Sequence, residues 1–178
     1  RKWGYREKGI PEGQAEIIDD LCISCGYCVT MCSQNAKRVR SSVEPVRELL
    51  AKASPTNASL TTAATVAMLA PSFPAAFLDL SPENLVGALR QAGFDGVFEV
   101  AFGADVVSQF YKEHYQELLS DQEKSFLISS PCPAVVFYIE KIFPELAPYV
   151  SPVVSPMEAM ARIVKRRIDP GASVVFIG

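Results

Sequence analysis

Four cysteines stand close together near the start of the chain, at Cys22, Cys25, Cys28 and Cys32. Their C-x2-C-x2-C-x3-C spacing lets a short loop wrap around a cubane, and it is typical of a [4Fe–4S] cluster. Thiolates are the ligands that iron–sulfur centres prefer, and Gly26 lets the backbone bend between two of them. A structural zinc knot or a disulfide pair are the alternatives. Zinc sites usually have two separated C-x2-C pairs, and a second pair does not follow in this sequence.

The fourth cysteine leaves a second question open. In two-cluster ferredoxins the fourth cysteine of one run binds the other cluster, but Cys32 is followed by Ser33 rather than by proline. We expect all four cysteines to hold one cluster, with a second run upstream of Arg1 as the alternative. Because the chain starts without methionine and stops at Gly178 after a strand-like run, we also expect a fragment of a larger protein.

Composition narrows the class of protein. Hydrophobic residues make up 49% of the 178 residues and charged residues 21%, which is enough for a globular core. A net charge of −3 favours neither nucleic acid nor an anionic membrane as a partner. Four of the five cysteines form one metal-type run, which indicates a reducing compartment. With neither a signal peptide nor an apolar stretch of about 18 residues, the sequence predicts a cytoplasmic protein.

Three segments follow one another along the chain. Residues 1–40 are predicted to form a small ferredoxin-like iron–sulfur domain, and residues 41–60 a helix and connector. Residues 61–178 alternate apolar, strand-like runs with helical patterns. The predicted strands cover residues 65–69, 97–100, 126–128 and 174–177. Strands separated by helices predict an α/β fold, a parallel sheet with flanking helices.

Capping residues mark several of the helices. Ser81 and Ser155 each precede a proline, which predicts an N-cap followed by a proline in the first turn. Gly93 is expected to close the first of these helices, and Asp105 to open a further helix. Chemistry in parallel sheets gathers beyond the carboxyl ends of the strands. Two runs lie there: residues 70–72 after the first strand and residues 130–133 after the third.

Several separate motifs of the last segment share their order with a known family. They are Ala70-Pro71-Ser72, Gly93-Phe94-Asp95-Gly96, Phe102-Gly103-Ala104-Asp105, Ser130-Pro131-Cys132-Pro133, Phe143-Pro144-Glu145-Leu146 and Ser155-Pro156-Met157. Together they resemble the amino-terminal half of the catalytic domain of the [FeFe]-hydrogenases, the iron-only hydrogenase large subunit. A ferredoxin-type segment upstream is also what that family carries.

The resemblance implies roles for four further residues. Cys132 matches one of four cysteine ligands of the family's active-site cubane, which is bridged to a di-iron site with CO and cyanide. Pro71 and Ser72 match the loop that contacts the cyanides, and Glu158 lies where relatives place a glutamine near the diatomic ligands. The other readings are an inert thiol at Cys132, a plain strand end at Pro71 and Ser72, and a glutamate complementing its helix dipole. The remaining three ligands are expected beyond Gly178, so whether the chain is part of an active enzyme stays open.

Departures from the family concern proton transfer. Fast hydrogenases carry a second cysteine where Pro131 stands, and two adjacent glutamates where Phe110 and Tyr111 stand. A relay serine matches Pro152, or Ser151 with a shifted register. Since proton relays need donors and acceptors within hydrogen-bond reach, turnover is expected to be slow.

This pattern resembles the sensory branch of the family, which is often fused to a signalling domain. We therefore expect a protein that binds or slowly converts hydrogen and exchanges electrons with a redox partner such as ferredoxin. One alternative is a non-catalytic hydrogenase-like scaffold or adaptor in cluster assembly. Another is a simple electron carrier in which only the ferredoxin segment works.

Overall fold

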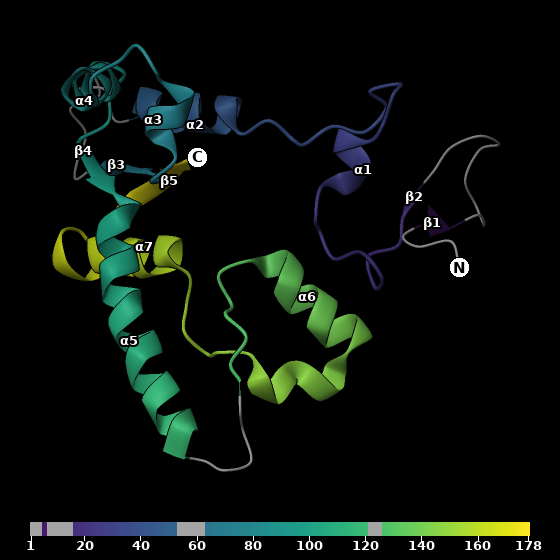
Figure 1. Cartoon of the computed structure of the whole chain (residues 1–178). Helices are drawn as coiled ribbons and strands as arrows, with labels where there is room; N and C mark the ends of the chain where they lie inside the picture. Colours follow the sequence, from purple (N-terminus) through teal and green to yellow (C-terminus); the bar gives the residue numbers. More distant parts are fainter. Residues whose placement is uncertain (1–4, 7–15, 53–62, 121–125) are drawn as a thin grey trace. The chain divides into compact units, whose positions relative to one another are not determined.

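The computed structural model describes residues 5–6, 16–52, 63–120 and 126–178 (Figure 1). It forms two compact units, each made of two stretches of chain. The first unit comprises Arg1–Val39 and Tyr111–Val153, and the second comprises Arg40–Phe110 and Val154–Gly178.

The first unit contains short strands, short helices and one full helix. Its elements are β1 (Tyr5–Arg6), β2 (Glu16–Ile17), α1 (Tyr27–Thr30), α6 (Pro133–Ile142), the 3-10 helix η1 (Pro144–Tyr149) and the later part of α5 (Val100–Ser120). The strands β1 and β2 pair antiparallel, with residues 6 and 16 as partners in the register. The cysteine run therefore follows a small hairpin-like pair, and α1 lies within the run.

The second unit holds the larger sheet. Its elements are α2 (Val43–Lys52), β3 (Thr65–Leu69), α3 (Phe73–Ala76), α4 (Pro82–Gln91), β4 (Gly96–Glu99), the first part of α5, α7 (Pro156–Arg167) and β5 (Ser173–Ile177). The sheet has the order β4-β3-β5, and both pairings are parallel. Ala67 in the middle of β3 pairs with Val97 on one side and Val175 on the other. The predicted α/β fold with a parallel sheet is confirmed.

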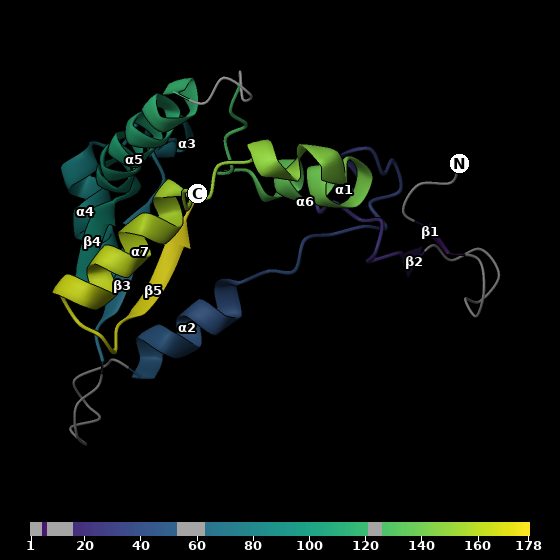
Figure 2. The same cartoon turned by 90° about the horizontal axis from the view of Figure 1, so that it is seen from below.

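Every residue of β3 is buried, which is what a central parallel strand requires. Val66 and Met68 pack in one cluster with Met160 and Val164 of α7, and each of these side chains is at most 4% exposed. Burying a side chain of this size contributes about 1.5–3 kcal/mol. Figures 1 and 2 show α2 and α7 on opposite sides of the sheet, so helices cover both of its faces.

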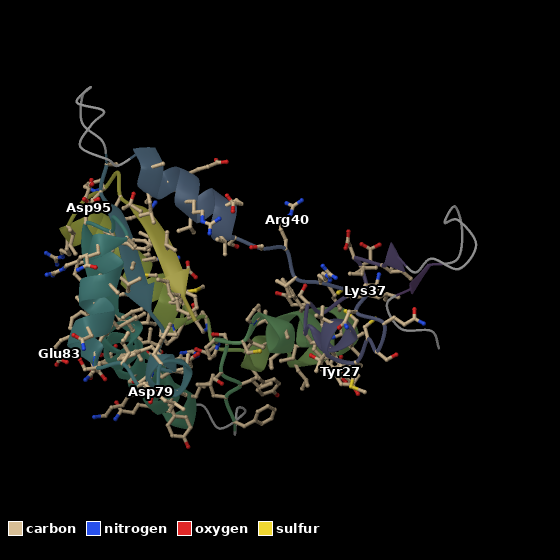
Figure 3. The ribbon with its side chains drawn as sticks, turned by 90° about the horizontal axis from the view of Figure 1, so that it is seen from above. Tyr27, Lys37, Arg40, Asp79, Glu83 and Asp95 are labelled. Carbon is tan, nitrogen blue, oxygen red and sulfur yellow. The ribbon has the colours of Figure 1, made fainter. Side chains whose placement is uncertain are left out.

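Two aspartates hold the start of β3 from the loops that enter its neighbours. Asp95, labelled in Figure 3, accepts the Thr65 amide at 2.7 Å and donates its own amide to the Thr65 carbonyl at 2.9 Å. Asp169 accepts the Ala64 amide at 2.9 Å and the Gly171 amide at 2.8 Å. These two amides lower the pKa of Asp169. Side-chain hydrogen bonds thus hold the amino-terminal end of β3 in place.

Two predictions of secondary structure were wrong in detail. The predicted strand over residues 126–128 is not part of the sheet, because Ile128 makes only an isolated parallel bridge with Val150 in the first unit. The helix expected to open at Asp105 begins at Val100, directly after Glu99 ends β4. The strand expected over residues 97–100 is therefore one residue shorter at its end, because helical hydrogen bonding takes over at Val100.

Candidate functional site

The cysteine run lies on a tight loop with two left-handed residues. The amides of Leu21 and Cys22 both donate to the Ile18 carbonyl, at 3.0 and 2.9 Å, and this turn leads into the run. Ser24 has φ +57° and Gly26 has φ +74°, so the backbone reverses on both sides of Cys25. Glycine adopts this conformation without strain, as the sequence predicted for Gly26. The short helix α1 begins directly afterwards and carries Cys28.

Backbone amides already point at two of the sulfur atoms. The Ser24 amide donates to Cys22 Sγ at 3.4 Å, and the Ala36 amide donates to Cys32 Sγ at 3.3 Å. The Ala36 amide is the main cause that lowers the pKa of Cys32, with smaller contributions from the amide and charge of Lys37. The thiolate is the form that binds metal, and these donors favour the thiolate of Cys32.

The donor set fits an iron–sulfur cluster. All five cysteines of the chain are free thiols; Cys25 is exposed, and Cys22, Cys28 and Cys32 are partly buried. In the part of the chain that the structure describes, however, no three cysteine, histidine or carboxylate side chains converge as a ready metal centre. Figure 3 labels Tyr27 and Lys37 in this sulfur-containing segment.

Cys132 occupies the N-cap position of the helix α6. Its backbone is extended, with φ −98° and ψ 109°, its side chain makes no capping hydrogen bond, and the residue is exposed. Pro131 precedes it and Pro133 is the first helical residue, so the backbone is restricted on both sides. The Cys132 thiol therefore lies at the start of a helix and is not buried.

A hydrogen-bond brace lies directly before Cys132, and no local sequence pattern indicates it. The Ser130 amide donates to the Tyr111 hydroxyl at 3.0 Å, and the Ser130 and Tyr111 hydroxyls lie 3.1 Å apart. The Ser130 hydroxyl donates to the Val153 carbonyl at 2.6 Å. These bonds join α5, the loop before Cys132 and the segment after η1 within one unit. Tyr111 therefore supports the loop that presents Cys132.

The other positions that the resemblance matches to a proton relay are occupied as follows. Ser151 is only 3% exposed, and its hydroxyl accepts the Val153 amide at 3.2 Å. Pro131 and Pro152 have no ionisable group. Phe110 is 55% exposed and apolar.

The three remaining candidate residues belong to the second unit. Pro71 and Ser72 form an exposed turn after β3, and the Ser72 side chain makes no capping bond to α3. This places them at the carboxyl edge of the sheet, as the sequence predicted. Glu158 lies in the first turn of α7, where its amide donates to the Ser155 hydroxyl at 3.2 Å and its carboxylate pairs with Arg162. Glu158 is thus occupied by a partner on its own helix.

Comparison with known families identifies both parts of the chain. Residues 63–178 match the family described as iron only hydrogenase large subunit, C-terminal domain. The chain belongs to this family. Residues 15–38 match the 4Fe-4S binding domain, which covers all four cysteines of the run. The chain is therefore an iron–sulfur, hydrogenase-like protein.

Relatives of two kinds are similar to the chain. The NADP-reducing hydrogenase subunit HndD of Solidesulfovibrio fructosivorans is 28% identical over 91% of this chain and 29% of its own length. The cytosolic Fe-S cluster assembly factor NAR1 of Yarrowia lipolytica is 27% identical over 91% of this chain and 33% of its own length. The solved [FeFe]-hydrogenase HydA(deltaEFG) has a TM-score of 0.67 and 28% identity, over 77% of this chain and 37% of that one. The chain thus spans about a third of the length of these relatives.

Among the described helices, none combines the length and apolar character that crossing a membrane requires.

Proposed function

We propose that Cys22, Cys25, Cys28 and Cys32 hold one [4Fe–4S] cluster, within a domain of residues 1–40. This cluster exchanges electrons with a hydrogenase-type site that the full-length protein assembles with Cys132 as one ligand. The site binds or slowly converts hydrogen, and the protein has a sensory role. The observation that carries the proposal is Pro131 beside the retained Cys132, with the Tyr111 hydroxyl bonded to the same loop.

The cluster supplies one-electron redox chemistry when it is bound. The protein holds it with four thiolates, and the amides of Ser24 and Ala36 donate to two of the sulfur atoms. Hydrogen bonds to the sulfur atoms of a cluster are among the features that set its reduction potential. The exposed Cys25 leaves the site open to a redox partner such as ferredoxin. Five free thiols are also what a reducing, cytoplasmic compartment maintains.

Four residues of this chain are proposed for the hydrogenase-type site: Cys132, Pro71, Ser72 and Glu158. Cys132 supplies one thiolate, and its loop is held by the Ser130–Tyr111 brace. Pro71 and Ser72 lie at the carboxyl edge of β3, where parallel sheets bind their ligands. Glu158 would contribute a carboxylate that is paired with Arg162 on the same helix.

Slow turnover follows from the groups that replace the relay. A proton relay needs ionisable side chains within hydrogen-bond reach of each other. Pro131 offers none, and the Tyr111 hydroxyl lies within hydrogen-bond distance of the Ser130 hydroxyl. Proton transfer contributes a factor of about 10²–10⁴ to catalysis, so its loss favours binding and reporting over turnover. A fused signalling domain would read the state of the site.

Restoring the relay cysteine tests this proposal in the full-length, matured protein. The Pro131→Cys variant should raise hydrogen turnover by about tenfold or more, measured as hydrogen evolution with a reduced dye. Pro131→Ala is the matched control, because it removes the ring without adding an ionisable group. Equal rates for both variants and the unaltered protein would remove the relay argument.

The competing function is a scaffold or adaptor in cluster assembly. It is supported by the similarity to the cytosolic Fe-S cluster assembly factor NAR1 and by the same missing relay groups. The two functions differ in the di-iron site. Infrared bands of bound CO and cyanide in the matured protein are expected for the hydrogenase-type function. Their absence, with ordinary iron–sulfur clusters present, would favour the scaffold.

A further inference from the structure

The ammonium group of Lys141 is bonded to the loop that starts the cysteine run. Lys141 lies in the last turn of α6, and its Nζ donates to the Asp19 carbonyl at 2.7 Å and to the Cys22 carbonyl at 2.8 Å. The two partners lie 122 and 119 positions away along the chain. One lysine thus joins the hydrogenase-like part of the sequence to the first cysteine of the run.

Both ends of this contact are fixed. The loop is a closed turn, because the Leu21 and Cys22 amides donate to Ile18. On the helix side, Lys141 Nζ lies 5.2 Å from the ring centroid of Phe137, one turn earlier on α6. A cation over an aromatic ring is attracted to it, which limits where the ammonium can lie. A lysine has three donors, and two of them are used on the loop.

The helix that carries Lys141 begins at the other candidate ligand. Cys132 caps α6, and the ten residues from Pro133 to Ile142 span about 15 Å at 1.5 Å per residue. The helix α6 therefore has the candidate hydrogenase-type ligand Cys132 at its start, and near its end Lys141 is bonded to the loop that contains Cys22. The Lys141 bonds fix the separation of the two.

We propose that Lys141 is a positioning residue for the ferredoxin-type cluster: it anchors the Cys22 loop to α6 and raises the reduction potential of the cluster. The inference rests on the proposed function, since it takes the cysteine run to bind a cluster. Anchoring follows from the two hydrogen bonds. The effect on potential follows because reduction adds negative charge, and a cation at the carbonyl of a ligand stabilises that charge.

Other charges near the loop set the expected size of the effect. The carboxylates of Asp19 and Asp20 on the same loop oppose the lysine, and Lys37 beyond the last cysteine adds to it. The segment is also partly open to water, which screens each charge. Removing the Lys141 charge should therefore make reduction about threefold to tenfold less favourable. A tenfold change corresponds to about 59 mV for a one-electron couple.

The experiment compares Lys141→Met, Lys141→Arg and Lys112→Met with the unaltered protein after anaerobic reconstitution. Lys112 lies in α5 of the same unit, and no hydrogen bond joins it to the cysteine segment in the part that the structure describes, so it controls for net charge. The readouts are iron per chain, the midpoint potential by electron paramagnetic resonance, and amide hydrogen exchange over residues 18–25.

Lys141→Met should lower the midpoint potential and speed amide exchange at residues 18–25. Lys141→Arg, which keeps the charge, and Lys112→Met should both leave the potential and the exchange as in the unaltered protein. An unchanged potential and unchanged exchange in Lys141→Met would overturn the inference. Faster exchange with an unchanged potential would overturn its electrostatic half. If the unaltered protein binds no iron, the proposed function fails instead, and the exchange data alone decide whether Lys141 anchors the loop.

Discussion

Gly103 in α5 offers a test in which two physical effects oppose each other. A methyl group at this position would lie 2.4 Å from the Pro156 carbonyl oxygen and 3.0 Å from the Met160 Cβ. Both obstacles belong to α7, so α5 and the start of α7 approach each other closely only because residue 103 has no side chain. We therefore consider the variant Gly103→Ala.

The magnitudes predict the sign of the change. Alanine is favoured over glycine in a helix by about 1 kcal/mol, so propensity alone predicts a gain. Overpacking costs about 1–3 kcal/mol, and the high end applies here because the obstacle is backbone. That backbone is held by the Ser155 cap, whose hydroxyl accepts the Glu158 amide. The net expectation is a loss of about 2 kcal/mol in the free energy of unfolding.

Gly87 in α4 is the matched control. A methyl group there would meet no atom within 4 Å, so Gly87→Ala should gain up to about 1 kcal/mol by propensity alone. The assay is urea unfolding followed by far-ultraviolet circular dichroism, with equal slopes required for comparison. A Gly103→Ala variant as stable as Gly87→Ala would refute the close approach of α5 and α7.

Two further predictions follow from single hydrogen-bonding side chains. Tyr111→Phe leaves the part-buried Ser130 amide without its acceptor and should cost about 1–3 kcal/mol in unfolding free energy. The same variant should speed the alkylation of Cys132. The control Tyr115→Phe, at a half-exposed tyrosine on the same helix, should change neither the stability nor the alkylation rate. Asp169→Asn should destabilise the protein at pH 7 in urea unfolding. The pKa of Asp169 is lowered in the folded state, so its contribution to stability is complete above the ordinary aspartate pKa of about 3.9 and is lost as the pH falls through the folded-state pKa. The unfolding midpoints of Asp169→Asn and the unaltered protein should therefore converge in acid. A difference between the midpoints that stays constant with pH would contradict this.

The sequence predicted features that are set by neighbouring residues. The Ser81 hydroxyl accepts the Asn84 amide at 3.3 Å and the Ser155 hydroxyl accepts the Glu158 amide at 3.2 Å, so both predicted caps are confirmed. The strand over residues 65–69 has the bounds that its apolar run indicated. These signals are readable because a cap or a buried strand depends on residues only a few positions apart.

Long-range features could not be predicted in this way. The sheet order β4-β3-β5 and the Lys141 bonds to residues more than 100 positions away leave no local pattern. The prediction of a sheet strand over the apolar run at residues 126–128 was wrong for the same reason. Its composition fits a strand, but its backbone pairs with Val150 rather than with the sheet, and periodicity carries no information on the partner.

The segment that was mistaken for a strand explains how Cys132 is supported. The Ile128 amide donates to the Tyr149 carbonyl, and the Ser151 amide donates back to the Ile128 carbonyl, both at 2.8 Å. Two residues later, the Ser130 hydroxyl bonds to Val153. The side chains at two relay positions, Ser151 and Tyr111, are used in this same brace. The hydrogen bonds of these two side chains thus help to hold the loop that presents Cys132.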